Sequence, residues 1–225
     1  HGLSILVVGL KLILRKESEM GYARKQISGV LDLKSEDGLW VRSYSELVGS
    51  TRVIYNTRAG CLWRDLTSRL KSNRHYSECS SMFKDFQEFA EWCQSQTAFG
   101  YMQKSSSQYW HLDKDILGSG SSKSYSPENC CFIPQDLNKT ISRFLVKSKG
   151  YHLHKETGKF RVKANDYDLG LFETEQEARR AWFEHRELTI RSILDHYKQS
   201  GYAREDVIDG VNNIIYNVER SLWAE

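Results

Sequence analysis

The sequence lacks the features that identify secreted and membrane-spanning proteins. Its only dense apolar run extends from Leu3 to Leu14, is interrupted by Lys11, and is shorter than the ~20 apolar residues that cross a bilayer. Arg15 and Lys16 follow the run, whereas a secretory signal has its basic residues ahead of the apolar stretch. We therefore predict a buried strand or strand pair at 3–14, no membrane partner, and a cytoplasmic location.

Cysteine is also scarce. The five cysteines are odd in number and share no repeated spacing, which argues against a disulfide framework and for a reducing compartment. The residues that could form a structural zinc site do not show the paired spacing that such a site needs, apart from one near miss, His75-x₃-Cys79. We do not expect structural zinc on this set: His75, Cys79, Cys93, Cys130 and Cys131.

Net charge is small, at +3 over 225 residues, but its distribution is uneven. Residues 139–163 contain eight basic and one acidic side chain, whereas residues 164–225 contain seven basic and thirteen acidic ones. A short cationic segment of this kind is typical of phosphate binding, because each neutralised phosphate releases condensed counterions. A solvated basic linker is the alternative interpretation. The composition, 40% hydrophobic and 27% charged, excludes a disordered chain.

The spacing of apolar residues predicts a mixed α+β chain. Residues 38–55 are rich in β-branched and aromatic residues and predict a small β-rich N-terminal part. Two amphipathic helices follow, one from about residue 61 and one around residues 83–92, whose aromatic stripe we assign to the core. The apolar positions that define these helices are Leu62, Trp63, Leu66, Leu70, Phe83, Phe86, Phe89, Ala90 and Trp92.

The C-terminal third alternates like a small sheet and then becomes helical. Strands are predicted at 151–153, 160–162 and 169–172, with a turn at 156–159. Thr174 and Glu177 form a capping-box pattern that begins a helix to about Lys198. An acidic helix from about Arg204 to Leu222 ends the chain and is a candidate surface for self-association.

One short segment groups residues that could perform chemistry. Within a strand predicted from Tyr109 to Leu117, His111, Asp113 and Asp115 occupy alternate positions and would project from one face. An imidazole beside two carboxylates can hold a hard divalent cation and activate water next to it. The alternative is an exposed polar strand with a local Asp–Lys pair.

The segment 60–140 resembles a group of bacteriophage proteins described as HNH homing-type endonucleases. The resemblance rests on the compound pattern Leu-Asp-Lys-Asp-Ile at 112–116 followed by Tyr-Ser-Pro-Glu-Asn-Cys at 125–130, with Trp63, Arg69, Phe86, Phe89, Trp92 and Asn138 around it. It implies a ββα-metal core in which a hairpin and a helix hold one divalent ion, Mg²⁺ or Mn²⁺. In this resemblance Asp113 is the first metal ligand and Asn129 is the ligand on the helix.

The chain departs from the HNH pattern at the general base. Typical HNH enzymes have a histidine directly after the aspartate, but this chain has Lys114, and a protonated ammonium cannot accept a proton from water. Ser122 stands where many relatives carry asparagine. Either His111 or Asp115 is then the catalytic base, or the site is inactive.

Residues 150–187 resemble the plant APETALA2-type DNA-binding domain, through Gly-Lys-Phe-Arg-Val at 158–162, Leu-Gly-Leu-Phe at 169–172 and Ala181-Trp182. That domain is a three-stranded sheet on one helix, and it places its sheet in the major groove of double-stranded DNA. Docking of the same sheet on the nuclease is the alternative. The residues predicted to contact DNA are Arg143, Lys147, Lys149, His152, His154, Lys155, Lys159, Arg161 and Lys163.

These inferences define four parts: an N-terminal β-rich part (1–58), an HNH-like ββα-metal domain (59–145), an APETALA2-like DNA-binding domain (146–200) and a C-terminal helix (201–225). The expected function is a phage-type HNH DNA endonuclease that hydrolyses phosphodiesters with a divalent metal. A catalytically degenerate DNA-binding protein on the same scaffold is the alternative. A protein-interaction role through the acidic C-terminal helix is the third.

Overall fold

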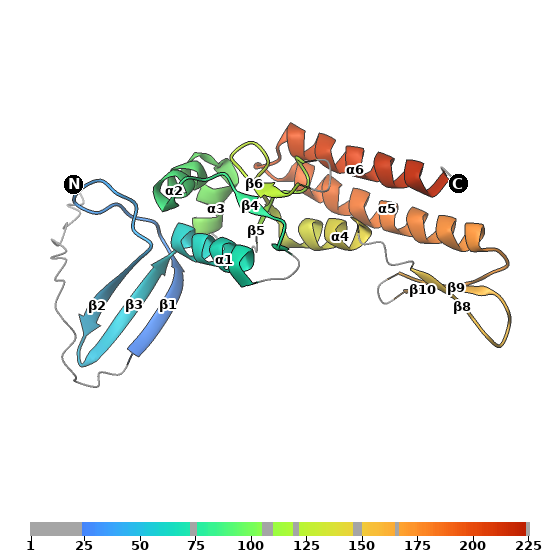
Figure 1. Ribbon diagram of the computed structural model, residues 1–225, viewed down its shortest axis with the longest axis horizontal. Coiled ribbons are helices and arrows are strands. Elements are labelled where there is room, and N and C mark those ends of the chain that lie inside the picture. The colour runs from blue at the N-terminus through green and yellow to red at the C-terminus, as the bar shows by residue number, and fades with distance from the viewer. Residues whose placement is uncertain are drawn as a thin grey trace.

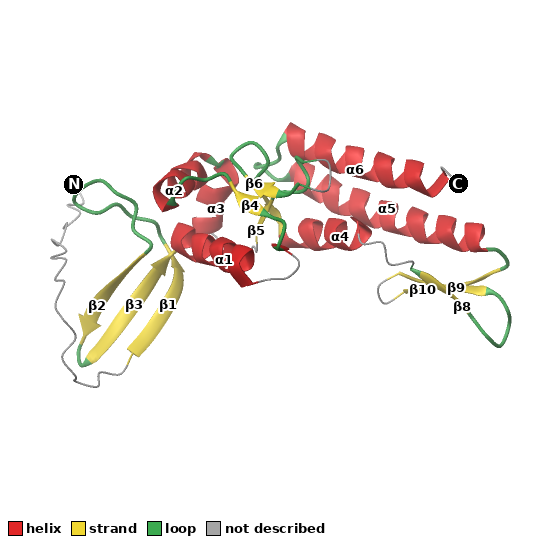
Figure 2. Ribbon diagram, in the orientation of Figure 1, coloured by secondary structure: helices red, strands yellow, loops and turns green. Residues whose placement is uncertain are grey.

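The fold is mixed α+β, with small sheets and two long C-terminal helices (Figures 1 and 2). The computed structural model describes residues 24–72, 76–104, 110–118, 122–145, 150–164 and 167–223. The molecule is elongated, with one three-stranded sheet at each end and helices α1 (Arg58–Ser72) and α4 (Gln135–Leu145) between them (Figure 1). The strand predicted at 3–14 lies outside the described residues.

The N-terminal sheet confirms the predicted β-rich part. It contains β1 (Arg24–Val30), β2 (Ser43–Val48) and β3 (Thr51–Thr57) in the order β1-β3-β2, with β1 parallel and β2 antiparallel to β3. Gly29 has φ +77 at a register shift in β1, a conformation that side chains other than glycine rarely adopt. Helix α1 begins directly after β3, so the sheet fixes where α1 starts.

The helical core of the N-terminal half is aromatic, as the sequence predicts. Helix α2 (Phe86–Ser95) is capped by Asp85, whose side chain accepts hydrogen bonds from the first-turn amides, and α3 (Thr97–Lys104) follows it. Phe89 is fully buried, and its ring contacts those of Trp63, Phe83 and Trp92. This cluster joins α1 to α2 and supports the central strands.

The centre contains two short strand pairs and one helix. β5 (Trp110–Asp113) is antiparallel to β7 (Cys131–Pro134), and β4 (Ser80–Ser81) is parallel to β6 (Ser124–Tyr125). Helix α4 begins immediately after β7 and packs on both β5 and β7. The prediction of a strand to Leu117 is wrong beyond Asp113, because the Asp113 carboxylate accepts hydrogen bonds from the amides of Asp115 and Ile116 and turns the chain.

The C-terminal part contains a three-stranded antiparallel sheet packed on a long helix. The strands are β8 (Tyr151–Leu153), β9 (Phe160–Ala164) and β10 (Tyr167–Phe172), in the order β10-β9-β8. Helix α5 (Glu175–Gln199) covers one face and has the predicted capping box, and α6 (Glu205–Trp223) packs along α5. Among the helices in the described part of the chain, none has the length and apolarity needed to span a membrane.

Candidate functional site

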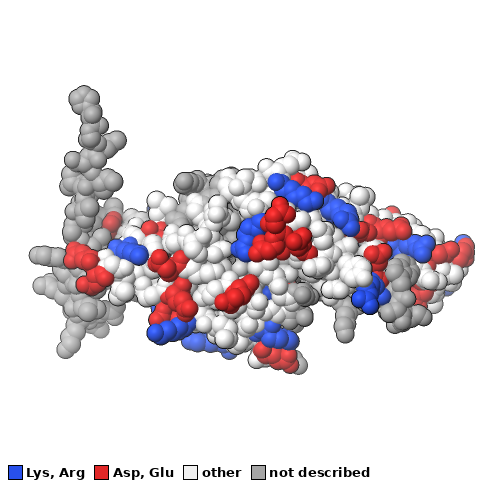
Figure 3. Space-filling view, turned by 90° about the horizontal axis from the view of Figure 1, so that it is seen from above, with Lys and Arg blue, Asp and Glu red and all other residues white. Residues whose placement is uncertain are grey.

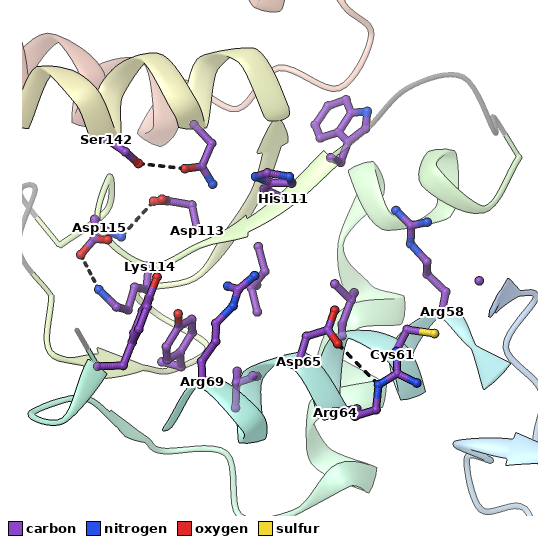
Figure 4. Close-up of a pocket in the computed structure, with 18 of the residues that line it drawn as sticks. Arg58, Cys61, Arg64, Asp65, Arg69, His111, Asp113, Lys114, Asp115 and Ser142 are labelled. Atoms are coloured by element: carbon purple, nitrogen blue, oxygen red, sulfur yellow. Dashed lines mark hydrogen bonds and ion pairs between the residues drawn. The ribbon is translucent and has the colours of Figure 1, made fainter. Parts of the chain in front are cut away.

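A groove of about 640 Å³ separates α1 from β5 and α4 (Figure 4). Its β5 side carries His111 and Asp113, and its α4 side carries Asn138 and Ser142. Along α1 it is lined by three arginines and extends to the bulge in β1 at Ser28 and Gly29. The groove therefore brings together residues of five elements: β1, α1, β5, β6 and α4.

His111 is positioned by β5 and by the first turn of α4. Its Nε2 lies 2.9 Å from Nε2 of Gln135, which restrains the ring. Partial burial, and then the positive charges of Lys139 and Arg69, lower the pKa of His111 below its ordinary value. The imidazole is therefore neutral at pH 7 and able to accept a proton or bind a cation.

Asp113 is two residues further along β5, so it shares a strand face with His111 at a spacing of about 7 Å. Its side chain is only 8% exposed. Oδ1 accepts hydrogen bonds from the amides of Asp115 at 2.9 Å and Ile116 at 2.8 Å. Burial raises the pKa of Asp113 against the lowering effect of these bonds. The carboxylate both turns the chain and faces the groove.

Lys114, which follows Asp113 in the chain, is held by other groups and is not available as a base. Its buried ammonium donates to Asp115 Oδ1 at 2.6 Å and to the carbonyl of Ser122 at 2.7 Å, and it lies over the rings of Tyr76 and Tyr125. Asp115 lies beyond the end of β5, so the prediction that it shares a strand face with His111 and Asp113 is wrong. Its carboxylate lines the groove but is paired with Lys114, which makes it a weaker candidate base than His111.

The predicted helix ligand needs correction. Asn129 lies in the turn before β7, not on a helix, and its amide donates to the hydroxyls of Ser122 at 3.1 Å and Ser124 at 3.4 Å. The helix that follows the strand pair is α4, and its amide in the groove is Asn138, whose Oδ1 accepts from Ser142 at 3.2 Å. Asn138 belongs to the resemblance pattern in the sequence, but helix α4 had to be located before its role could be assigned.

The arginines of α1 form the other wall, and sequence reasoning missed them. Arg69 extends toward His111 (Figure 4). Its side chain also interacts with that of Tyr125. Arg58 and Arg64 line the groove further from β5. Arg69 belongs to the resemblance pattern, where it has no assigned role, and one sequence does not distinguish the other two arginines from ordinary exposed charges of an amphipathic helix.

The residues predicted to contact DNA lie in two regions, the β8–β9 hairpin and helix α4, except for two that lie outside the described residues. In β8 and β9, His152, Arg161 and Lys163 lie on the face turned away from α5, since the alternate residues Tyr151, Val162 and Ala164 are buried. Lys155 is exposed in the β8–β9 turn, His154 contacts Thr157 there, and Arg143 is exposed on α4. Lys147 and Lys149 lie outside the described residues.

Two basic residues of this sheet have acidic partners within the module. Arg161 pairs with Asp168 on β10, which raises the pKa of Arg161 and lowers that of Asp168, and Lys159 pairs with Glu173. These exposed pairs are weak, so phosphate groups can compete for the cations. Figure 3 shows that the face seen from above carries interspersed blue and red patches instead of one basic field.

The groove offers nitrogen and oxygen donors from His111, Asp113 and Asn138. Within the described ranges, no group of three or more His, Cys, Asp or Glu side chains is arranged to hold a metal. Asp113 and Asn138 offer oxygen donors, and Mg²⁺ completes its shell with water and phosphate oxygens instead of a full protein cage. Cys93, Cys130 and Cys131 are buried free thiols, and burial raises their pKa.

Comparisons with protein-family models, curated proteins and solved structures find no match for this chain.

Proposed function

We propose that this chain is an HNH-type DNA endonuclease that hydrolyses a phosphodiester bond in the groove between α1, β5 and α4. The observation that carries the proposal is the meeting of His111, Asp113 and Asn138 in one groove beside the cationic side chain of Arg69. A base, two oxygen donors and a fixed positive charge are the parts that phosphodiester hydrolysis requires. The antiparallel pair β5–β7, with α4 directly after β7, supports the proposed ββα core.

Asp113 and Asn138 would hold one Mg²⁺ or Mn²⁺ ion. When bound, such an ion neutralises charge that develops on the phosphate and the leaving oxygen. The burial of Asp113 favours this role, because a buried carboxylate with a raised pKa gains from a nearby cation. Its Oδ1 is fixed by two backbone amides, so the carboxylate is oriented before any ligand arrives.

His111 would accept the proton of the attacking water. The amide of Gln135 can be oriented in two ways: its nitrogen donates to Nε2 of His111, or its oxygen accepts from Nε2–H. In the second orientation the hydrogen is on Nε2, so the lone pair of Nδ1 is free to accept the proton of water. The lowered pKa keeps the ring neutral near pH 7, as a general base requires. Arg69 would bind a non-bridging phosphate oxygen and offset the charge of the transition state.

The proposed partner is double-stranded DNA, bound also by the outer face of the β8–β10 sheet. That sheet packs on α5 through one face and presents Arg161 and Lys163 on the other. A two- or three-stranded ribbon fits the major groove. We propose an APETALA2-like mode of binding for this module.

A non-catalytic DNA-binding protein is the second candidate, favoured by one observation. Asp113 Oδ1 is already used to cap the turn at Asp115 and Ile116, which gives the residue a structural role without a metal. The two candidates differ in cleavage, not in affinity.

Conversion of supercoiled plasmid to nicked or linear DNA separates them, with Mg²⁺, Mn²⁺ or EDTA present. We expect metal-dependent cutting by the wild type, a loss of at least about 100-fold in His111→Gln, and a much smaller loss in Asp115→Asn. If the wild type binds plasmid but does not cut it with either metal, the binding protein is the correct interpretation. Equal loss in both variants would contradict the assignment of the base.

A further inference from the structure

The groove continues well beyond the proposed catalytic end. From His111 and Asp113 it follows α1 toward the N-terminal sheet and reaches Ser28 and Gly29 in β1. The part of α1 that lines it includes Arg58, Leu62, Asp65 and Arg69, which recur every three or four residues and so lie on one stripe of the helix. Apart from Arg69, this stretch has no role in the chemistry described above.

The two arginines at the ends of this stripe are separated by a defined length. Eleven residues at 1.5 Å each place Arg69 and Arg58 about 16 Å apart along the axis of α1. Arg69 is at the end near His111, and Arg58 is at the end near the N-terminal sheet (Figure 4). This length is enough for more than one phosphate of a strand, since each nucleotide advances about 3.4 Å along the duplex axis.

Arg58 is held toward the groove by its surroundings. A side chain at Gly29 would place its Cβ 3.8 Å from Nη1 of Arg58, so the glycine bulge of β1 lies directly against the guanidinium. Nε of Arg58 is buried without a hydrogen-bond partner in the described part of the structure. Asp32 lies nearby: its carboxylate accepts a hydrogen bond from the amide of Ala59 at 2.9 Å, and the positive charge of Arg58 lowers its pKa against the larger effect of burial.

The charge along the stripe remains positive. Asp65 lies between the two arginines, but its Oδ1 is 3.5 Å from Nε of Arg64, which also lines the groove. The α1 wall therefore has three cations and one carboxylate, and an anionic polymer fits it better than a neutral or cationic ligand.

We propose that α1 is a phosphate-binding track that holds one DNA strand between the catalytic end of the groove and the N-terminal sheet. Arg69 contacts a phosphate at the cleavage site, and Arg58 contacts a phosphate several nucleotides away on the same strand. The inference rests on the proposed function, because it takes DNA as the ligand. It adds a binding surface distinct from the β8–β10 sheet. In this proposal the N-terminal sheet forms the end of the track that is farthest from His111.

The first test measures binding of the full chain to a 30-base-pair duplex in EDTA, over a range of salt concentrations. Each phosphate contact contributes about 0.9 to the slope of log affinity against log salt, equivalent to about eightfold in affinity between 0.1 M and 1 M salt. Arg58→Gln and Arg69→Gln should each lower the slope by about one. Lys71→Gln is the matched control, since Lys71 is an exposed cation of α1 that does not line the groove.

The second test locates the DNA with the native thiols. Cys61 lines the groove on α1, whereas Cys79 is equally half-buried but outside it. Bound duplex should slow alkylation of Cys61 by iodoacetamide several-fold and leave the rate at Cys79 unchanged. If Arg58→Gln is unstable, Arg58→Lys keeps the charge and should keep the wild-type slope.

The outcomes separate this inference from the proposed function. Suppose that the wild type cuts DNA with metal, that both arginine variants keep the wild-type salt dependence of binding, and that DNA does not protect Cys61. This result would overturn the phosphate-binding track but not the proposed endonuclease. A weaker salt dependence of binding in both arginine variants and protection of Cys61, without cutting by the wild type, would support the track and contradict the proposed endonuclease.

Discussion

Substitution of Asp113 separates its structural role from its proposed role in cleavage. Asp113→Ala removes the acceptor for the amides of Asp115 and Ile116, and the second of these is buried. An unsatisfied buried amide costs about 1–3 kcal/mol, and the partly exposed one costs less, so we expect a loss of roughly 2–4 kcal/mol in the free energy of unfolding. For a chain of this length that corresponds to a fall of about 5–15 °C in Tm.

Asp113→Asn should behave differently, because the amide oxygen can still accept both backbone hydrogen bonds. Burial raises the pKa of the Asp113 carboxyl in the folded protein above its unfolded value, so folding favours the protonated form. The wild type therefore loses stability as the pH rises through the raised pKa, and the asparagine variant does not. We expect the Tm of Asp113→Asn to match that of the wild type near pH 4 and to exceed it at pH 8.

The assay is thermal unfolding in EDTA at pH 4 to 8 for the three proteins, followed by plasmid cleavage with Mg²⁺ or Mn²⁺. The asparagine variant should be at least as stable as the wild type at pH 8 and yet lose cleavage by about 100-fold or more. An alanine variant with a wild-type Tm would refute the capping role. An asparagine variant that still cuts would refute the assignment of Asp113 as a ligand.

Three further predictions concern the parts that support the groove and the C-terminal module. Phe132→Ala should lower the free energy of unfolding by about 3–5 kcal/mol in urea denaturation, since the ring is 2% exposed; a loss under 1 kcal/mol would contradict its place in the core. Gly150→Ala should lower the Tm measurably, because its Cβ would lie 1.8 Å from the ring of Trp182, and an unchanged Tm would contradict that close approach. Thr174→Ala should cost about 1 kcal/mol by removing the cap of α5, whereas a neutral result in the same denaturation would mean that Glu177 caps the helix alone.

The regular elements could be predicted because their signals are local. The spacing of Leu62, Leu66 and Leu70 defines one face of α1, and the Thr174–Glu177 box marks the start of α5. Both helices depend on short-range periodicity and capping, which one sequence displays directly. The same applies to the hairpin between β8 and β9.

The end of β5 could not be predicted from alternation alone. The pattern of polar and apolar residues continues past Asp113, but the carboxylate accepts two amides further along the chain and turns it. Alternation says nothing about whether an aspartate bonds its own backbone or points into solvent. The prediction therefore made the strand too long, and Asp115 reaches the groove from the turn instead of from β5.

The proposed site draws its residues from separate elements, and only some of them could be singled out from the sequence. His111 and Asp113 were found from their spacing within one strand. Asn138 was exchanged for Asn129, and Arg58 and Arg69 were missed, because their positions depend on how α4 and α1 pack against β5. Only the packed structure distinguishes an amide in a turn from an amide that faces the groove.

The most direct test of the proposed site compares two asparagines in one cleavage assay. Asn138→Ala removes an amide that lines the groove, and Asn129→Ala removes one that bonds Ser122 and Ser124 outside it. With Mg²⁺ or Mn²⁺ and supercoiled plasmid, we predict that the first variant loses cutting by about 100-fold and that the second, where folded, cuts within a few-fold of the wild type. Equal activity of the two variants, or loss confined to Asn129→Ala, would contradict a catalytic groove between α1, β5 and α4.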